Sequence, residues 1–64
     1  MPVTVIIRKK ELTFEAGLTV FQLFTRLGLP LEAYLVLRNG ELITEDEHLR
    51  EGDVIELIAV ISGG

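Results

Sequence analysis

The pattern of apolar and polar residues in the first fifteen positions predicts a β-hairpin. Val3, Val5 and Ile7 alternate with their neighbours, and the β-branched content of this stretch favours a strand over a helix. A polar turn at 8–11 follows, and residues 12–15 then alternate again. We therefore expect two antiparallel strands joined by a short turn.

The next segment has the spacing of an amphipathic helix. Thr19 followed three residues later by Gln22 is a capping-box pattern, and the apolar residues after it recur at helical spacing. Gly28 suits the left-handed position after the last turn, and Pro30 prevents the helix from resuming. We expect a helix at residues 20–27.

The second half of the chain predicts three further strands. Residues 34–37 are β-prone and meet Asn39-Gly40, the dipeptide best suited to a tight hairpin turn, so a short return strand is expected at 42–43. The polar residues after it predict a loop, in which Leu49 is the one large apolar anchor. The last strand is expected at 54–61, where the apolar run is long.

This order of elements predicts an α+β fold in which a mixed four- to five-stranded sheet packs on one helix. Residues 1–61 are expected to form the domain, and residues 62–64 a flexible Ser-Gly-Gly tail. A chain of 64 residues buries only about 60% of its unfolded surface and leaves little room for an enclosed active site. An independent enzyme is therefore not expected.

Composition excludes several classes of function. The net charge of −4 opposes direct binding to nucleic acid or to an anionic membrane, since both need clustered Lys and Arg. No cysteine is present, so the chain has no disulfide, thiolate metal site or thiol nucleophile. No metal is expected at His48, because consecutive loop residues seldom converge on one ion. The apolar runs are too short for a membrane span or signal peptide, and the protein is expected to be cytoplasmic.

The terminal diglycine carries the candidate chemistry. Gly63 and Gly64 have no Cβ, so with Ser62 they form a slender end that can thread a narrow channel. An α-carboxyl with a pKa of about 3.3–3.7 is ionised at neutral pH and is a poor electrophile. The carboxyl of Gly64 must therefore be activated by a separate enzyme, for example as an acyl-adenylate.

The order of elements, the capped helix, the Asn39-Gly40 turn and the terminal Gly63-Gly64 together resemble a β-grasp, ubiquitin-like domain. In length and motif order the chain is similar to the ThiS and MoaD sulfur-carrier family. The ending at residues 60–64 is most similar to small carriers that supply sulfur to tRNA thiolation.

The resemblance implies that an adenylating enzyme of the ubiquitin-activating type joins AMP to Gly64 and that a persulfide donor converts the adenylate to a thiocarboxylate. It implies as partners a sulfur donor, such as a cysteine desulfurase or a rhodanese-type protein, and a sulfur-accepting synthase or tRNA thiolase. ATP would come through the activating enzyme, with no cofactor bound permanently. Gly63 would be needed for passage into the enzyme, and Ser62 would be a polar spacer.

Docking on the activating enzyme is expected to use an exposed apolar surface. Glu56 indicates which face of the last strand points outward, and by ubiquitin-like analogy Val36 points inward on the neighbouring strand. The outward surface is expected to contain Leu35, Leu37, Ile58 and Val60. The expected core contains Val3, Val5, Leu12, Val20, Leu23, Leu27, Ile55 and Leu57.

Three destinations for the sulfur remain open: tRNA uridine, the thiazole of thiamine and the dithiolene of molybdopterin. The ending favours tRNA. Two other classes remain as well. One is a ubiquitin-like modifier that is joined to lysines through Gly64, and the other is an interaction module in which the diglycine is incidental.

Overall fold

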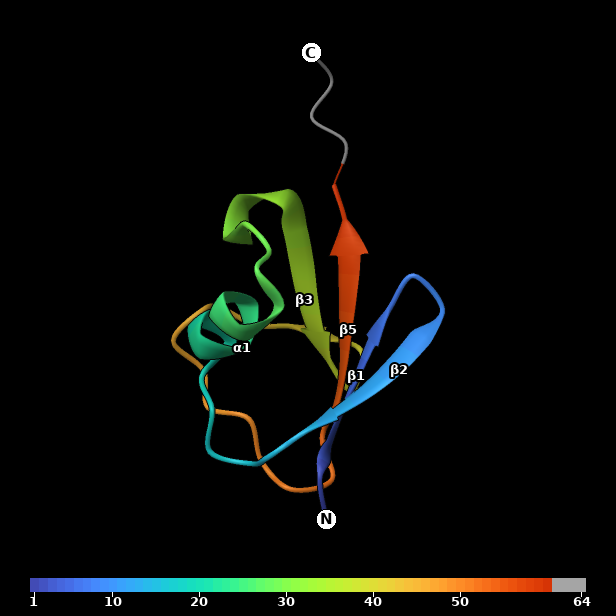
Figure 1. Ribbon diagram of the computed structural model, residues 1–64, viewed down its shortest axis with the longest axis vertical. Helices are drawn as coiled ribbons and strands as arrows, with labels where there is room; N and C mark the ends of the chain where they lie inside the picture. Colours follow the sequence, from blue (N-terminus) through green and yellow to red (C-terminus); the bar gives the residue numbers. More distant parts are fainter. Residues whose placement is uncertain (61–64) are drawn as a thin grey trace.

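The computed structural model describes residues 1–60 and confirms the expected α+β architecture. The elements are β1 (Val3–Ile7), β2 (Lys10–Phe14), α1 (Val20–Leu27), the 3-10 helix η1 (Leu31–Ala33), β3 (Tyr34–Arg38), β4 (Glu41–Leu42) and β5 (Val54–Ala59) (Figure 1). The strands form one sheet in the order β2-β1-β5-β3-β4, in which β1 and β5 are parallel and the other neighbours antiparallel. The expected domain end at residue 61 and the tail at 62–64 lie outside the described residues.

The helix begins and ends where the sequence predicts. Thr19 Oγ1 accepts a hydrogen bond of 3.1 Å from the backbone N–H of Gln22, and the Thr19 N–H donates one of 2.9 Å to Gln22 Oε1. Gly28 ends the helix with φ 72°, and its N–H donates to the carbonyls of Phe24 and Thr25. Both helix ends are therefore satisfied by local residues.

Replacing Thr19 with Ala is expected to lower the free energy of unfolding by about 1 kcal/mol, because the N-cap side chain loses its bond to the first turn. Chemical denaturation of the variant measures this. The matched control is Thr25→Ala, since the exposed Thr25 hydroxyl bonds the Phe21 carbonyl within the helix and contributes no cap. A Thr19 variant as stable as the Thr25 variant would contradict the role of the capping box.

The core lies between α1 and the three central strands. Its side chains are small and aliphatic apart from Phe24, and the loop before β5 contributes Leu49, which confirms the single anchor expected there. Leu27 is only partly buried against this core. The buried cluster consists of Val3, Val5, Val20, Leu23, Phe24, Val36, Leu49, Ile55 and Leu57.

The prediction that Leu12 is a core residue is wrong. Leu12 pairs with Val5 across the β1–β2 hairpin and so projects from the helix side of the sheet, yet 36% of it is exposed. β2 is an edge strand of the sheet, and Figure 1 shows the hairpin turning away from α1. Alternation gave the correct face, but the helix does not extend far enough to cover that edge.

Several strand boundaries differ from the prediction, and the main differences come from a turn or a neighbouring strand. Arg8 and Lys9 both have positive φ, so two residues rather than four make the first turn and β2 begins at Lys10. The equally tight Asn39-Gly40 turn starts β4 at Glu41 rather than at residue 42. β5 ends at Ala59, because the residue opposite the next position belongs to η1 instead of β3.

Candidate docking surface and carrier end

The outward face of β5 is the one that Glu56 indicates. Burial alternates along the strand, with Ile55 and Leu57 buried against the core and Val54, Glu56 and Ile58 exposed. The core thus fills one face of the sheet, and the opposite face presents its side chains to solvent.

The structure brings the predicted docking residues together on this outward face. Leu35 pairs directly with Ile58. Val60 lies one register step beyond the end of β5, where its N–H donates a 2.9 Å hydrogen bond to the Ala33 carbonyl. Leu35, Ile58 and Val60 are 44%, 39% and 40% exposed. Leu37 pairs with Glu56 and is half-buried, so it offers less exposed area to a partner than Leu35 does.

Two more exposed aliphatics extend this surface and were missed from the sequence. Leu42 of β4 pairs with Leu37, so both project from the same face. Val54 lies at the start of β5 on the Glu56 side. The Asn39-Gly40 turn would have been enough to find Leu42, because a two-residue turn fixes which residues pair. We call Leu35, Leu37, Leu42, Val54, Ile58 and Val60 the outer apolar surface.

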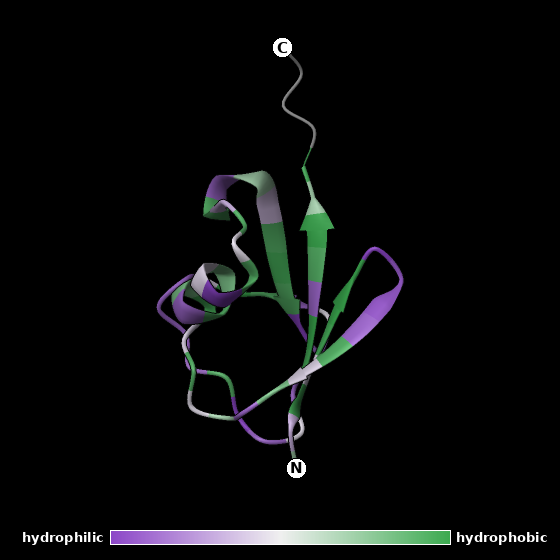
Figure 2. Ribbon diagram, viewed as in Figure 1, coloured by the Kyte–Doolittle hydropathy of each residue, from purple (hydrophilic) through white to green (hydrophobic). Residues whose placement is uncertain are grey.

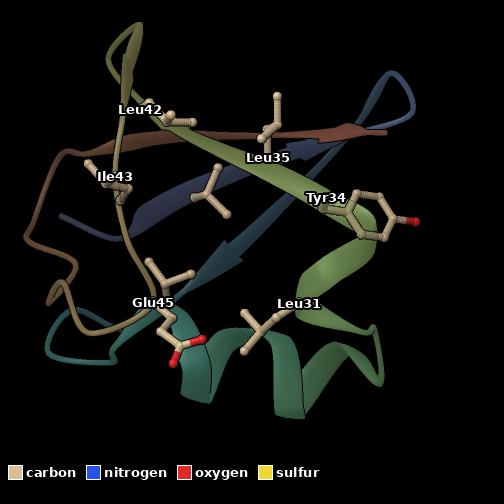
Figure 3. Close-up of a pocket in the computed structure, with 8 residues that line it drawn as sticks. Leu31, Tyr34, Leu35, Leu42, Ile43 and Glu45 are labelled. Atoms are coloured by element: carbon tan, nitrogen blue, oxygen red, sulfur yellow. The ribbon is translucent and has the colours of Figure 1, made fainter. Parts of the chain in front are cut away.

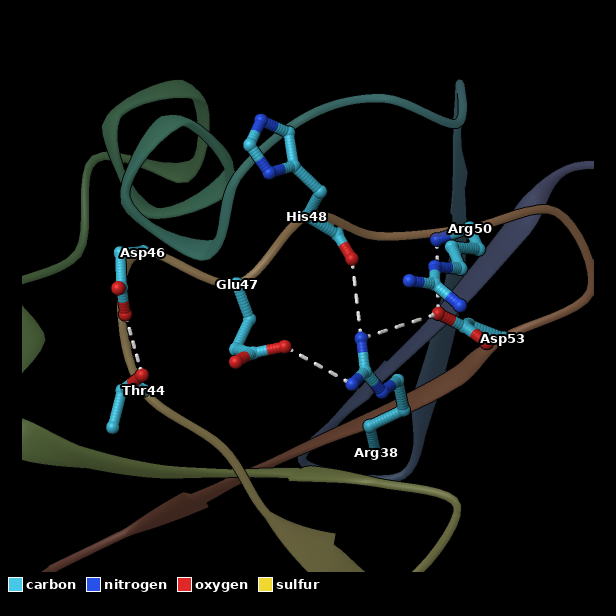
Figure 4. A network of polar contacts seen from close by, with 7 residues as sticks. All are labelled: Arg38, Thr44, Asp46, Glu47, His48, Arg50 and Asp53. Atoms are coloured by element: carbon cyan, nitrogen blue, oxygen red, sulfur yellow. Dashed lines mark hydrogen bonds and ion pairs between the residues drawn. The ribbon is translucent and has the colours of Figure 1, made fainter.

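Arg38, at the end of β3, connects the loop between β4 and β5 to the sheet (Figure 4). Arg38 Nη2 lies 3.1 Å from Glu47 Oε1, and Nη1 donates to the His48 carbonyl at 3.1 Å and lies 3.8 Å from Asp53 Oδ2. Asp53 Oδ2 also accepts the Arg50 N–H at 2.9 Å. The carboxylates of Glu47 and Asp53 thus help to hold the loop against the sheet.

Replacing Arg38 with Met is expected to lower the free energy of unfolding by about 1–3 kcal/mol, because Asp53 is only 13% exposed and would lose its cationic partner. Arg26→Met is the matched control. Its ion pair with Glu15 is exposed at both ends, and such pairs contribute about 0–1 kcal/mol. Equal losses in urea denaturation of the two variants would show that the Arg38 cluster has no special role.

The same loop contains a carboxyl, that of Asp46, whose pKa is lowered. A hydrogen bond from the Thr44 hydroxyl, with a smaller contribution from the backbone, lowers the pKa of Asp46. A carboxyl whose pKa is lowered in the folded state stabilises the fold at pH values above its unfolded-state pKa. This stabilisation is lost as the pH falls through the folded-state pKa. Asp46 is fully exposed, so its effect is local to the loop.

Two hollows lie on the surface of the described residues. One hollow of about 200 Å³ lies between β3, β4 and α1 (Figure 3). A second of about 290 Å³ lies against the outer side of the helix. Both fall below the roughly 300–1,000 Å³ of typical ligand sites. Among residues 1–60, no three His, Cys, Asp or Glu side chains converge to hold a metal ion.

The predicted reactive end, Ser62, Gly63 and Gly64, lies outside the described residues. The structure does place the base of that end: Val60 follows β5, a central strand paired on both sides. The outer apolar surface therefore continues to the last described residue. Within the described part of the chain, no helix is long and apolar enough to cross a membrane.

The sheet order and the single helix define a ubiquitin-like β-grasp protein. The model of the ThiS family matches residues 3–64, and the chain belongs to this family. It is a small sulfur carrier of the ThiS/MoaD type rather than an enzyme in its own right.

Known proteins resemble the chain over nearly its whole length. It is 32% identical over 56 residues to the sulfur carrier protein TtuB of Thermus thermophilus, covering 88% of this chain and 86% of that protein. The thiamine biosynthesis protein ThiS of Geobacter metallireducens superposes with a TM-score of 0.72 at 27% identity, with both chains fully covered. A chain from the complex of subunits 1 and 2 of the Helicobacter pylori molybdopterin-converting factor superposes with a TM-score of 0.70 at 25% identity, and both chains are again fully covered.

Proposed function

We propose that this protein carries sulfur as a thiocarboxylate on Gly64 and donates it to tRNA thiolation. The observation that most supports the carrier chemistry is the reach of the family match, which extends over residues 3–64 and so includes the terminal diglycine. A terminal carboxylate that follows two glycines, which have no Cβ, is suited to entering the narrow active site of another enzyme for activation.

In the first step, the Gly64 carboxylate attacks the α-phosphate of ATP on a ubiquitin-activating-type enzyme, and pyrophosphate leaves. The terminal sulfur of a persulfide donor then attacks the acyl carbon, and AMP leaves. A thiol cleaves the resulting sulfur–sulfur bond by reduction, which leaves the thiocarboxylate on Gly64. Adenylation makes AMP the leaving group. This step is needed because an oxygen of the ionised carboxylate is a poor leaving group.

The partners supply what this chain lacks. The sequence contains no cysteine, so the donor, for example a cysteine desulfurase or a rhodanese-type protein, provides the reactive sulfur. ATP enters through the activating enzyme. The outer apolar surface is the docking face, and Ser62 and Gly63 give Gly64 its passage. We expect these steps in the cytoplasm.

The proposal that the sulfur goes to tRNA rests on two similarities. The ending of the chain resembles that of tRNA-thiolation carriers, and the chain is 32% identical over 56 residues to the sulfur carrier TtuB. The similarity to a thiamine biosynthesis protein and to a molybdopterin-converting factor supports two alternatives, transfer to the thiazole of thiamine and to the dithiolene of molybdopterin. Conjugation to lysines through Gly64 begins with the same activation and is a further alternative.

Intact-mass measurement tests the carrier chemistry. The protein is incubated with ATP, a candidate adenylating enzyme from the same host and a persulfide source, and a mass increase matching replacement of one oxygen by sulfur is expected. An unchanged mass, with the enzyme shown to be active on another carrier, would contradict the proposal. The loaded protein is then offered separately to a tRNA thiolase, a thiazole synthase and a molybdopterin synthase. Sulfur transfer to tRNA alone is the expected result, and isopeptide-linked products would indicate the modifier role.

A further inference from the structure

The charges of this acidic protein are unevenly distributed. Three of its six cationic residues are consecutive, at Arg8, Lys9 and Lys10, whereas six of its ten acidic residues lie at 41–53. We call Arg8, Lys9 and Lys10 the basic turn, which appears as a hydrophilic segment in Figure 2. All three side chains are exposed, and none forms an ion pair with another residue of the described chain.

The basic turn lies beside the end of the strand that leads toward Gly64. β1 runs parallel to β5 with Ile7 opposite Leu57, so the turn after β1 points to the same end of the sheet as β5 (Figure 1). The Arg8 guanidinium reaches toward β3 and donates a long hydrogen bond of 3.4 Å to Tyr34 Oη.

This contact positions Arg8 over the last residues of β5. Tyr34 is the strand partner of Ala59, and its ring packs edge-to-face on Phe24 with centroids 6.0 Å apart. A guanidinium has five N–H donors, and the single long bond leaves most of them available to another molecule. The last described residues, Ala59 and Val60, therefore lie between the outer apolar surface on one face of the sheet and the Arg8 guanidinium on the other.

The backbone of the turn gives a separate reason to assign a role to these side chains. Arg8 and Lys9 have φ of 51° and 68°, a left-handed conformation that Asn and Gly adopt far more readily. The chain uses Asn39 and Gly40 for the same geometry in its other tight turn. The first turn thus keeps two long cationic side chains where Asn-Gly would be more stable, a pattern that occurs at functional sites.

We propose that the basic turn binds carboxylate side chains of the adenylating enzyme, beside the entrance that receives the diglycine end. This inference rests on the proposed function and adds a second, electrostatic contact to it. Complementary charges mainly raise the rate of encounter and orient the partners. Protein carboxylates are favoured over RNA phosphates, because three cations on a molecule of net charge −4 give a weak footprint for nucleic acid.

The test is a variant that removes the charges and improves the turn. In R8N/K9G, the thermal midpoint of unfolding is expected to rise, while kcat/KM for loading of the carrier falls about tenfold at low salt. The loss is expected to shrink as salt approaches about 1 M, where the Debye length is about 3 Å. R26Q/R50Q is the matched control, since it makes the same change in net charge away from the turn and is expected to load like the wild type.

Each alternative outcome is distinguishable. Loading of R8N/K9G at the wild-type rate and with wild-type salt dependence would overturn the inference while leaving the carrier function intact. Normal loading combined with slower tRNA thiolation would also overturn it, in favour of a contact with RNA. If the wild-type protein itself is not loaded by an active enzyme, the proposed function fails and the inference fails with it.

Discussion

Deletion of Gly64 is expected to abolish formation of the thiocarboxylate while leaving the folded domain unchanged. The deletion moves the terminal carboxylate back by one residue, which is at most about 3.3–3.6 Å of extended chain. Misplacement of a reacting group by about 1 Å can already cost about 100-fold in rate. Intact-mass measurement after incubation with ATP, the adenylating enzyme and the persulfide source gives the result directly.

Two further variants separate the position of the carboxylate from the shape of the end. Gly64→Ala keeps the chain length and adds a Cβ, so it is expected to load slowly but measurably. Ser62→Ala is the matched control and is expected to load at the wild-type rate, because the proposed role of Ser62 is that of a polar spacer. Loading of the deletion variant at the wild-type rate would contradict a Gly64 thiocarboxylate and favour the interaction-module alternative.

Local sequence signals were enough to predict the helix and the faces of the last strand. Thr19, Gln22 and Gly28 satisfy the helix ends with bonds to residues within a few positions, so short-range spacing contains the information. Glu56 identified the outward face of β5, because a period of two has only two possible phases. Both inferences depend on residues a few positions apart, and both are confirmed.

The features that the sequence did not predict depend on contacts between distant segments or on unusual backbone conformations. Leu12 has the correct phase, but no periodic signal shows that α1 stops short of the edge strand. The contacts of Arg38 join β3 to residues nine to fifteen positions later, in a loop without periodicity. The positive φ of Arg8 and Lys9 could not be predicted either, because neither residue type favours that conformation.

The proposed recognition region also has one part that the sequence predicts and one part that it does not. Leu35, Ile58 and Val60 were placed correctly because two adjacent strands with a known outward phase must share a surface. The nearness of the basic turn to the end of β5 depends on β1 and β5 being parallel neighbours, a pairing between residues about fifty positions apart. Sequence patterns thus found the apolar half of the proposed recognition region and missed its cationic half.

Loss of the outer apolar surface is expected to be the second most damaging change to the carrier. Leu35 and Ile58 are strand partners in the middle of this surface, and each retains substantial exposure in the folded protein. A few residues at the centre of an interface can each contribute about 2 kcal/mol, and about 1.4 kcal/mol changes affinity tenfold. Replacing both with Ser is therefore expected to weaken binding to the adenylating enzyme by about 100-fold or more, as measured by calorimetric titration.

The stability of this double variant should fall much less than its affinity, because the outward face is opposite the buried core. Phe21→Ser is the matched control: Phe21 is 55% exposed on α1, which packs on the other side of the sheet. It removes a larger apolar side chain from the surface and is expected to bind normally. Weaker binding of the Phe21 variant than of the Leu35/Ile58 variant would assign docking to the helix side and would refute the outer apolar surface as the docking face.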